Sequence, residues 1–297
     1  LVQNSPREVT SPGMTNDATT LSGLKGNSFI VWSELVKNIK FLLAYPIVFV
    51  FWAIFPIFWF IPFILQGQAI VGGLESRSFA RIAGTPEFIP FVVLGSILNS
   101  YVLTSLYGMG ESIRREAYQG TLDYILSSPC NKAFILIGKA LSESLASTIF
   151  AFNQSLICIA FFGIEVTLGI IIPVVFIIVL LILGLYGIAL MLSAASLQFK
   201  QAHDLAHSLE YVFYLFSPVR YPVESLPFWA QVVGKLLPLT YALIAVRSLM
   251  LLKLGLSAIY LEIFILFIID TLLIVFGFYL FNRMEERTKK SGVISQY

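Results

Sequence analysis

Residues 168–192 read LGIIIPVVFIIVLLILGLYGIALML, an apolar run without a single charged side chain. This run exceeds the roughly 20 residues that an α-helix needs to cross the hydrocarbon core of a bilayer. The whole chain of 297 residues shares the bias, because 58% of it is hydrophobic and only 12% is charged, whereas soluble domains carry about 25% charged residues. So few polar groups exclude a water-soluble enzyme, a disordered chain and a disulfide scaffold. The sequence predicts an all-α integral membrane protein.

Outward from this run, the hydropathy pattern predicts six transmembrane helices, at about residues 41–65, 88–109, 140–162, 168–192, 202–219 and 258–281. The fifth is the weakest, because Asp204, His207 and Glu210 shorten its apolar length. With six spans and both termini inside, 13 Lys and Arg residues lie on the cytoplasmic side and 6 on the outer side. This distribution obeys the positive-inside rule. Five spans would place the basic run after Phe281 outside, so six is the better count.

The regions around the spans differ in composition. Residues 1–26 are rich in Ser, Thr, Asn, Gly and Pro without a hydrophobic period, and they indicate a disordered N-terminal tail. Residues 27–290 hold the six-span domain, and residues 291–297 are a cytosolic C-terminal tail. Residues 217–255 are broken by Pro and Gly yet are too apolar for a free loop. There we expect a re-entrant outer helical hairpin between spans five and six.

Residues 27–40 have the pattern of an amphipathic helix. Trp32 and its apolar neighbours fall on one side, and Glu34 and Lys37 fall largely on the other. Such a helix suits the inner membrane surface, so we expect an N-terminal interfacial helix. A plain cytosolic extension of the first span would fit the same residues.

The chain lacks a nucleotide-binding signature of its own. The phosphate-binding motif GxxxxGK[ST] is missing, since Gly138-Lys139 is followed by Ala140 and preceded by Ala133 where the first glycine would stand. Any nucleotide must therefore bind another chain. The internal loop 111–129 mixes charges of both signs with an apolar stripe. This mixture is typical of a docking element for a soluble partner, although an ordinary solvated loop would have the same composition.

Two segments, at matching places in the six-span frame, carry a family resemblance. Residues 115–139 resemble the loop between the second and third spans of type-2 ATP-binding cassette (ABC) exporter permeases, with Arg-Glu at 115, Gly-Thr-Leu-Asp at 120, Ser-Pro at 128 and Gly-Lys at 138. Residues 216–247 resemble the same family's segment between spans five and six. The resemblance covers about residues 27–290. Ser217-Pro218 stands where many members have Ser-Gly.

The resemblance implies a non-catalytic permease subunit, paired with an identical copy or a paralogue, that binds two separate ATP-binding cassette ATPases. ATP and magnesium would bind the partner ATPase, and this chain would hold no cofactor or metal. The likeness assigns ATPase coupling to Glu111, Arg114, Arg115, Glu116, Gly120, Thr121, Leu122, Asp123 and Pro129. It assigns the interfacial helix to Trp32, Glu34 and Lys37, and an outer gate to Pro227, Trp229, Pro238, Thr240, Tyr241 and Arg247.

By the same resemblance, we expect export of an amphipathic, lipid-like or lipid-linked substrate, such as a drug, lipid or glycan. Transport would use alternating access at the plasma or inner membrane of a prokaryote, with both termini cytoplasmic. Candidate residues for the translocation path are Phe55, Trp59, Asn99, Asn153 and Asp270. For the aromatic residues of the first span, plain contact with lipid is the simpler explanation.

Asp270 lies near the middle of the last span, where a carboxylate is costly and is a functional candidate. It would be essential in an alternative function, a secondary transporter driven by an ion gradient. Pairing with a polar group on a neighbouring helix, such as Asn99, Asn153 or Gln154, is the simpler expectation.

A second alternative is an intramembrane zinc protease built on His203 and His207, which stand one helical turn apart. A zinc hydrolase needs a third ligand and a correctly placed general base. Asp204 replaces the glutamate of the HExxH motif, and these are the only two histidines. We therefore expect both to lie at the membrane surface, where the fifth span begins.

Overall fold

The computed structural model of the chain describes residues 24–44, 77–110, 132–162, 168–198 and 202–291, with single positions among 47–65 and at 116, 120 and 124. The described residues form helices and no strand. The longer helices are α1 (Leu24–Ala44), α4 (Phe88–Thr104), α7 (Lys132–Phe162), α8 (Leu168–Gln198), α9 (Ala202–Phe216), α11 (Pro238–Met250) and α12 (Tyr260–Ser291). The short elements are α3 (Arg77–Ala83), the π-helix η3 (Ser105–Gly110), η4 (Val223–Ser225), α10 (Phe228–Gly234) and η5 (Leu256–Ala258).

Four helices within the described residues are long and apolar enough to cross a membrane: Phe88–Gly108, Phe134–Leu156, Gly169–Ser196 and Tyr260–Arg287. They overlap the second, third, fourth and sixth predicted spans, and they confirm the all-α membrane class. The first predicted span lies almost wholly outside the described residues. At the fifth, α9 has 15 residues, or about 22 Å of helix, which is short of a bilayer core of about 30 Å. The six-span count therefore stays a prediction.

Three helices are longer than the hydropathy pattern indicated. α7 begins at Lys132 rather than near 140, α8 continues to Gln198, and α12 continues to Ser291. Hydropathy follows the part of a helix that lies in lipid. The backbone hydrogen bonds of a helix continue into water wherever the sequence tolerates them. The extra turns carry Lys139 at the head of α7 and Arg283 and Arg287 on α12.

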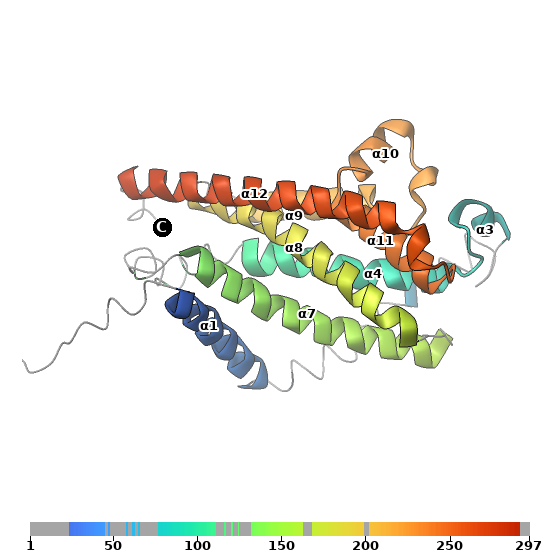
Figure 1. Cartoon of the computed structure of the whole chain (residues 1–297), viewed down its shortest axis with the longest axis horizontal. Helices are drawn as coiled ribbons and strands as arrows, with labels where there is room; N and C mark the ends of the chain where they lie inside the picture. The colour runs from blue at the N-terminus through green and yellow to red at the C-terminus, as the bar shows by residue number, and fades with distance from the viewer. Residues whose placement is uncertain are drawn as a thin grey trace, which may run out of the picture.

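The long helices form one bundle (Figure 1). Its core is built mainly by α4, α8 and α11, whose fully buried side chains include Leu98, Leu181 and Leu243. α1 lies at one end, beside the start of α7, whereas α3 and α10 lie toward the other end (Figure 1). α1 and the start of α7 thus lie at the opposite end of the bundle from α3 and α10.

α8 and α12 pack closely because Gly184, Gly187 and Gly277 have no side chains at their contact. A Cβ on Gly187 would collide with the backbone of α12 at Leu273, and a Cβ on Gly277 would collide with the carbonyl of Gly187. Small residues allow such backbone approach between membrane helices, where the hydrophobic effect does not drive association. Away from this contact, α12 exposes large apolar side chains, including Phe264, Leu272 and Val275. Their exposure fits a surface that faces lipid or another membrane chain.

Candidate functional site

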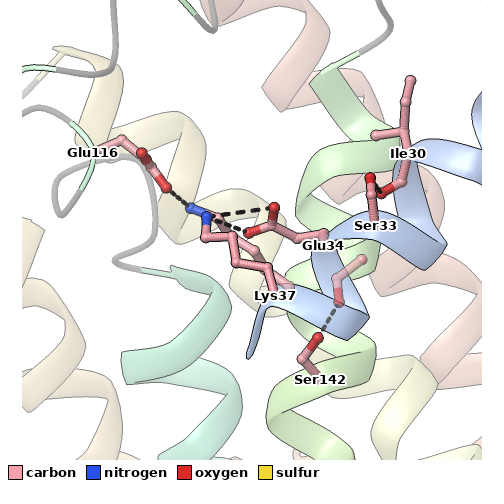
Figure 2. Close-up of polar contacts among 8 residues, drawn as sticks. Ile30, Ser33, Glu34, Lys37, Glu116 and Ser142 are labelled. Atoms are coloured by element: carbon pink, nitrogen blue, oxygen red, sulfur yellow. Dashed lines mark hydrogen bonds and ion pairs between the residues drawn. The ribbon is translucent and has the colours of Figure 1, made fainter. Parts of the chain in front are cut away.

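α1 packs against the first turns of α7 at Gly138. A Cβ on Gly138 would lie 3.0 Å from the Cβ of Glu34 and 3.2 Å from the Cα of Val31, so the missing side chain is what lets the two helices meet. The carbonyl of Gly138 also accepts a hydrogen bond from Ser142, one turn later, at 2.8 Å (Figure 2). α1 is thereby packed on the first turns of α7, at the start of the third predicted span.

The two sides of α1 have different surroundings. Phe29 and Trp32 are 62% and 63% exposed, as an apolar face against lipid requires. The Glu34 side chain is only 14% exposed, and it pairs with Lys37 at 3.1 Å, whose side chain stays 62% exposed (Figure 2). The amphipathic pattern predicted a polar side that contains Glu34. The structure places that side partly against α7.

Glu116 is a buried residue of the predicted coupling loop. It is 8% exposed and forms an ion pair with Lys139 of α7 (Figure 2). A buried pair of this kind depends on both partners, because losing one leaves an uncompensated charge. We expected Glu116 to contact a partner chain. Within this chain its carboxylate fastens the loop to Lys139, the residue next to Gly138, where α1 packs. The contact with a partner chain stays a prediction.

Two other loop positions are described. Gly120 has a φ of +70°, a backbone conformation that favours glycine, and a Cβ there would meet nothing within 4 Å. Tyr124 is 77% exposed. The other predicted coupling residues lie outside the described residues: Glu111, Arg114, Arg115, Thr121, Leu122, Asp123 and Pro129.

The outer hairpin is a sharply bent helix pair, α10 and α11, with 89° between the two axes. Pro227 precedes α10 and Pro238 opens α11, positions where a missing backbone N–H costs nothing. Thr240 donates a hydrogen bond to the carbonyl of Gly234 across the bend at 2.7 Å. These contacts close the bend and support the prediction of a helical hairpin after the fifth predicted span.

Arg247 ties the hairpin to the rest of the bundle. Only 6% of it is exposed, and its guanidinium donates to the carbonyls of Phe91 at 2.8 Å, Val219 at 2.9 Å and Pro218. The group also lies 3.4 Å above the centre of the Phe91 ring. One cation thus joins α11, the turn after α9 and the start of α4.

Two further predicted gate residues, Trp229 and Tyr241, lie on α10 and α11. Trp229 is 64% exposed, and its ring meets Phe216 edge-on at 5.8 Å. Tyr241 is half-buried. Of the predicted gate, Thr240 therefore holds the bend of the hairpin and Arg247 joins the hairpin to the bundle, whereas Trp229 is exposed.

The structure describes only some of the residues predicted to line the translocation path. Phe55 and Trp59 lie outside the described residues, and Asn99 and Asn153 are half-buried on α4 and α7. Asp270 is 3% exposed and faces α8, where a Cβ on Gly184 would collide with its carboxylate. Among the described residues neither oxygen of this carboxylate has a hydrogen-bond partner. The expected pairing of Asp270 with Asn99, Asn153 or Gln154 is therefore wrong.

His207 belongs to a polar cluster that the sequence did not suggest. Its Nδ1 lies 2.6 Å from the hydroxyl of Tyr107 on η3, and that hydroxyl donates to Glu210. Exactly one hundred residues separate Tyr107 from His207, so no local spacing could have connected them. In the described part of the chain, no group of three or more His, Cys, Asp or Glu side chains could hold a metal ion. The zinc protease alternative gains no support.

One helical bundle thus joins α1, the predicted coupling loop at Glu116 and the bent helix pair α10 and α11. A comparison with protein families adds the matching observation: residues 20–251 match the family described as ABC-2 type transporter. The chain belongs to the ABC-2 type transporter family. The match begins just before α1, contains Glu116, Lys139 and the outer hairpin, and ends before α12. No curated protein matches the chain.

Membership confirms the predicted resemblance and makes this ABC-2 chain an integral membrane component of an ABC transporter. Such permeases are transport components that associate with ATP-binding cassette subunits. The structural centre at the head of α7 is therefore a candidate for contact with such a subunit.

Proposed function

We propose that the chain is the membrane permease of an ATP-driven exporter, paired with a second permease and served by two separate ATPase subunits. ATP and magnesium would bind those subunits. The cargo would be an amphipathic, lipid-like or lipid-linked molecule such as a drug, lipid or glycan. The exposed apolar side chains of α12 support a chain that shares its surface with lipid or a second membrane subunit.

The arrangement at the head of α7 is the observation that carries this proposal. α1 rests on Gly138, and the internal loop is fastened to Lys139 through Glu116. A force applied by an ATPase to either element would reach the same turn of α7. Because α7 is a continuous helix of 31 residues, the force would then act along a whole span. ATP-driven rocking of two permeases would open the path by alternating access.

The orientation follows from the charges. Arg283 and Arg287 lie at the last turns of α12, and Lys289 and Lys290 follow them, so the positive-inside rule favours a cytoplasmic C-terminus. We infer a cytoplasmic N-terminus as well, in the plasma or inner membrane of a prokaryote. The outer hairpin with Arg247 would then face outward, where it would act as the gate.

The test is copurification of an ATPase with the tagged full-length chain from its native membrane, identified by nucleotide binding and mass spectrometry. We expect Arg115→Ala to remove most of the bound ATPase, because the loop loses a cation from its proposed contact. Arg81→Ala is the matched control: Arg81 is exposed on α3, at the opposite end of the bundle. Equal ATPase recovery from Arg115→Ala and the parent chain would contradict the coupling role of the loop.

An ion-gradient-driven carrier is the second candidate. It is favoured by the carboxylate of Asp270, which has no hydrogen-bond partner among the residues that the structure describes. Vesicles that contain the purified chain alone would then transport without ATP. Uptake driven by a pH gradient that disappears in Asp270→Asn would support this carrier and overturn the exporter. No such uptake, together with ATPase-dependent transport by Asp270→Asn, would support the exporter.

A further inference from the structure

A three-membered polar cluster links η3 to α9. The hydroxyl of Tyr107 donates to a carboxylate oxygen of Glu210 and lies 2.6 Å from Nδ1 of His207. That Nδ1 is 3.4 Å from the same oxygen of Glu210. The rings of Tyr107 and His207 meet edge-on, with centres 5.3 Å apart. Three polar atoms therefore form a closed triangle between two elements that are far apart in sequence.

Counting hydrogens determines how this triangle is bonded. The Tyr107 hydroxyl has one hydrogen, which it gives to Glu210, and a carboxylate has none to give. The 2.6 Å contact with His207 is then a hydrogen bond only if Nδ1 of the imidazole carries a hydrogen. Nδ1 is also the nitrogen that faces Glu210. The geometry therefore requires a donor at the Nδ1 position of residue 207.

η3 is held on its other side as well. A Cβ on Gly108 would lie 2.6 Å from Cγ of Glu143, so η3 packs directly on α7 at this point. η3 ends at Gly110, and the segment that follows is the predicted coupling loop. Single π-helical turns within α-helices are often found at functional sites, because they shift the register of the residues after them. The stem of the loop thus lies between α7 and the Tyr107 cluster.

We propose that Tyr107, His207 and Glu210 form a latch that makes α9 move together with the stem of the coupling loop. The proposal rests on the proposed function, since it adds a second route for ATPase movement beside the head of α7. Tyr107 is a positioning residue here: it acts on α9 through His207 and Glu210. The exposed face of α9, with Tyr211 and Leu215, is the surface that this latch would reorient.

The latch is tested first in the purified full-length chain in lipid nanodiscs, by hydrogen exchange of residues 202–216. Tyr107→Phe removes both contacts, and we expect exchange in the first turns of α9 to rise about tenfold, the loss typical of a hydrogen bond to a charged group. His207→Asn keeps an amide nitrogen on Cγ, at the place of Nδ1, and should retain the slow exchange of the parent. His207→Gln carries its amide one carbon farther and should behave like Tyr107→Phe.

The variants His207→Asn and His207→Gln distinguish a latch from a merely structural role, because their amide groups differ only in the position of the donor. Equal exchange in His207→Asn and His207→Gln, or parental exchange in Tyr107→Phe, would overturn the latch. The Tyr211→Phe variant serves as a control and should leave the exchange unchanged, since it removes a tyrosine hydroxyl from a residue of α9 that is 62% exposed.

Transmission is tested with an environment-sensitive fluorophore on Ser208→Cys, an exposed position of α9, after Cys130→Ser and Cys158→Ser. With the ATPase recovered by copurification, ATP and vanadate should shift the emission in the parent and in His207→Asn. In Tyr107→Phe and His207→Gln the shift should fall at least about fivefold while the ATPase stays bound. An unchanged shift in Tyr107→Phe would overturn the latch, whereas failure to recover an ATPase would overturn the proposed function and leave the exchange test to decide the latch.

Discussion

The two ends of the bundle use charge in different ways. At the outer hairpin, the buried guanidinium of Arg247 is held by three backbone carbonyls and one aromatic ring. At the head of α7, the charges come in pairs of side chains, Glu116 with Lys139 and Glu34 with Lys37. Backbone carbonyls cannot leave without rearranging the start of α4 or the turn after α9, whereas side-chain pairs can exchange partners. The comparison indicates a hairpin held as one rigid body and an inner end that is able to respond to another chain.

Arg247→Met should cause the largest loss of stability, because it removes the contacts that join the outer hairpin to the bundle. The carbonyls of Phe91, Val219 and Pro218 would lose their donor, and each unsatisfied buried group costs about 1–3 kcal/mol. We expect a loss of at least about 3 kcal/mol in stability, measured as a lower thermal unfolding midpoint in nanodiscs. Arg220→Met is the control in the same hairpin. Its cation lies 4.6 Å from the Tyr214 ring, and it should cost clearly less. An unfolding midpoint in Arg247→Met equal to that of the control would refute the rigid outer end.

Lys139→Met should give the next largest effect, because it removes the cation that pairs with the carboxylate of Glu116, a residue that is 8% exposed. The side chains of Lys139 and Glu116 are 12% and 11% exposed. We therefore expect a loss of about 2–3 kcal/mol in stability, below the upper range for fully buried pairs. The measurement is again the unfolding midpoint, together with recovery of the ATPase.

A double change sharpens this result. Glu116→Gln combined with Lys139→Met removes both charges, and it should regain most of the stability that Lys139→Met loses. Lys37→Met, at the exposed pair, should change stability by less than about 0.5 kcal/mol. If the double variant were less stable than the parent chain by the sum of the two single losses, the two residues would not act as a pair.

Gly138→Ala should reduce stability less than Arg247→Met or Lys139→Met does. Its Cβ would lie 3.0 Å from that of Glu34, so α1 must move by a few tenths of an ångström, at a cost of about 1 kcal/mol. We expect faster hydrogen exchange in α1 and weaker ATPase binding. Gly169→Ala is the matched control, because a Cβ there meets nothing within 4 Å and a helical alanine is favoured over glycine. Parental exchange in Gly138→Ala would show that α1 does not depend on this contact.

Much of the architecture could be predicted from sequence, and for a simple reason. Apolar runs such as 168–192 report the solvent around a helix, which depends only on local composition. The interruptions at Pro227 and Pro238 report a bend in the same local way. The ends of the helices were predicted less accurately. α7 and α12 continue into water, where hydropathy does not indicate where the helical backbone ends.

The site was predicted in part. The resemblance singled out Glu116 and Arg247, but it did not say what they touch. Glu116 pairs with Lys139, 23 residues later, and Arg247 reaches Phe91, 156 residues earlier. A cation at the head of a span, following a loop that carries an acidic residue, was the one available signal for the first pair. No sequence signal connected Tyr107 with His207.

The sequence alone determined that this chain lives in a membrane, where most of its spans lie, and which family it belongs to, because these properties follow from composition and from motifs read in order along the chain. The tertiary structure alone decided which charges are paired inside the bundle and which are left to meet another molecule. Helix packing brings distant residues within 3 Å of each other, and a few missing side chains, at Gly138, Gly184 and Gly187, set where the helices can approach.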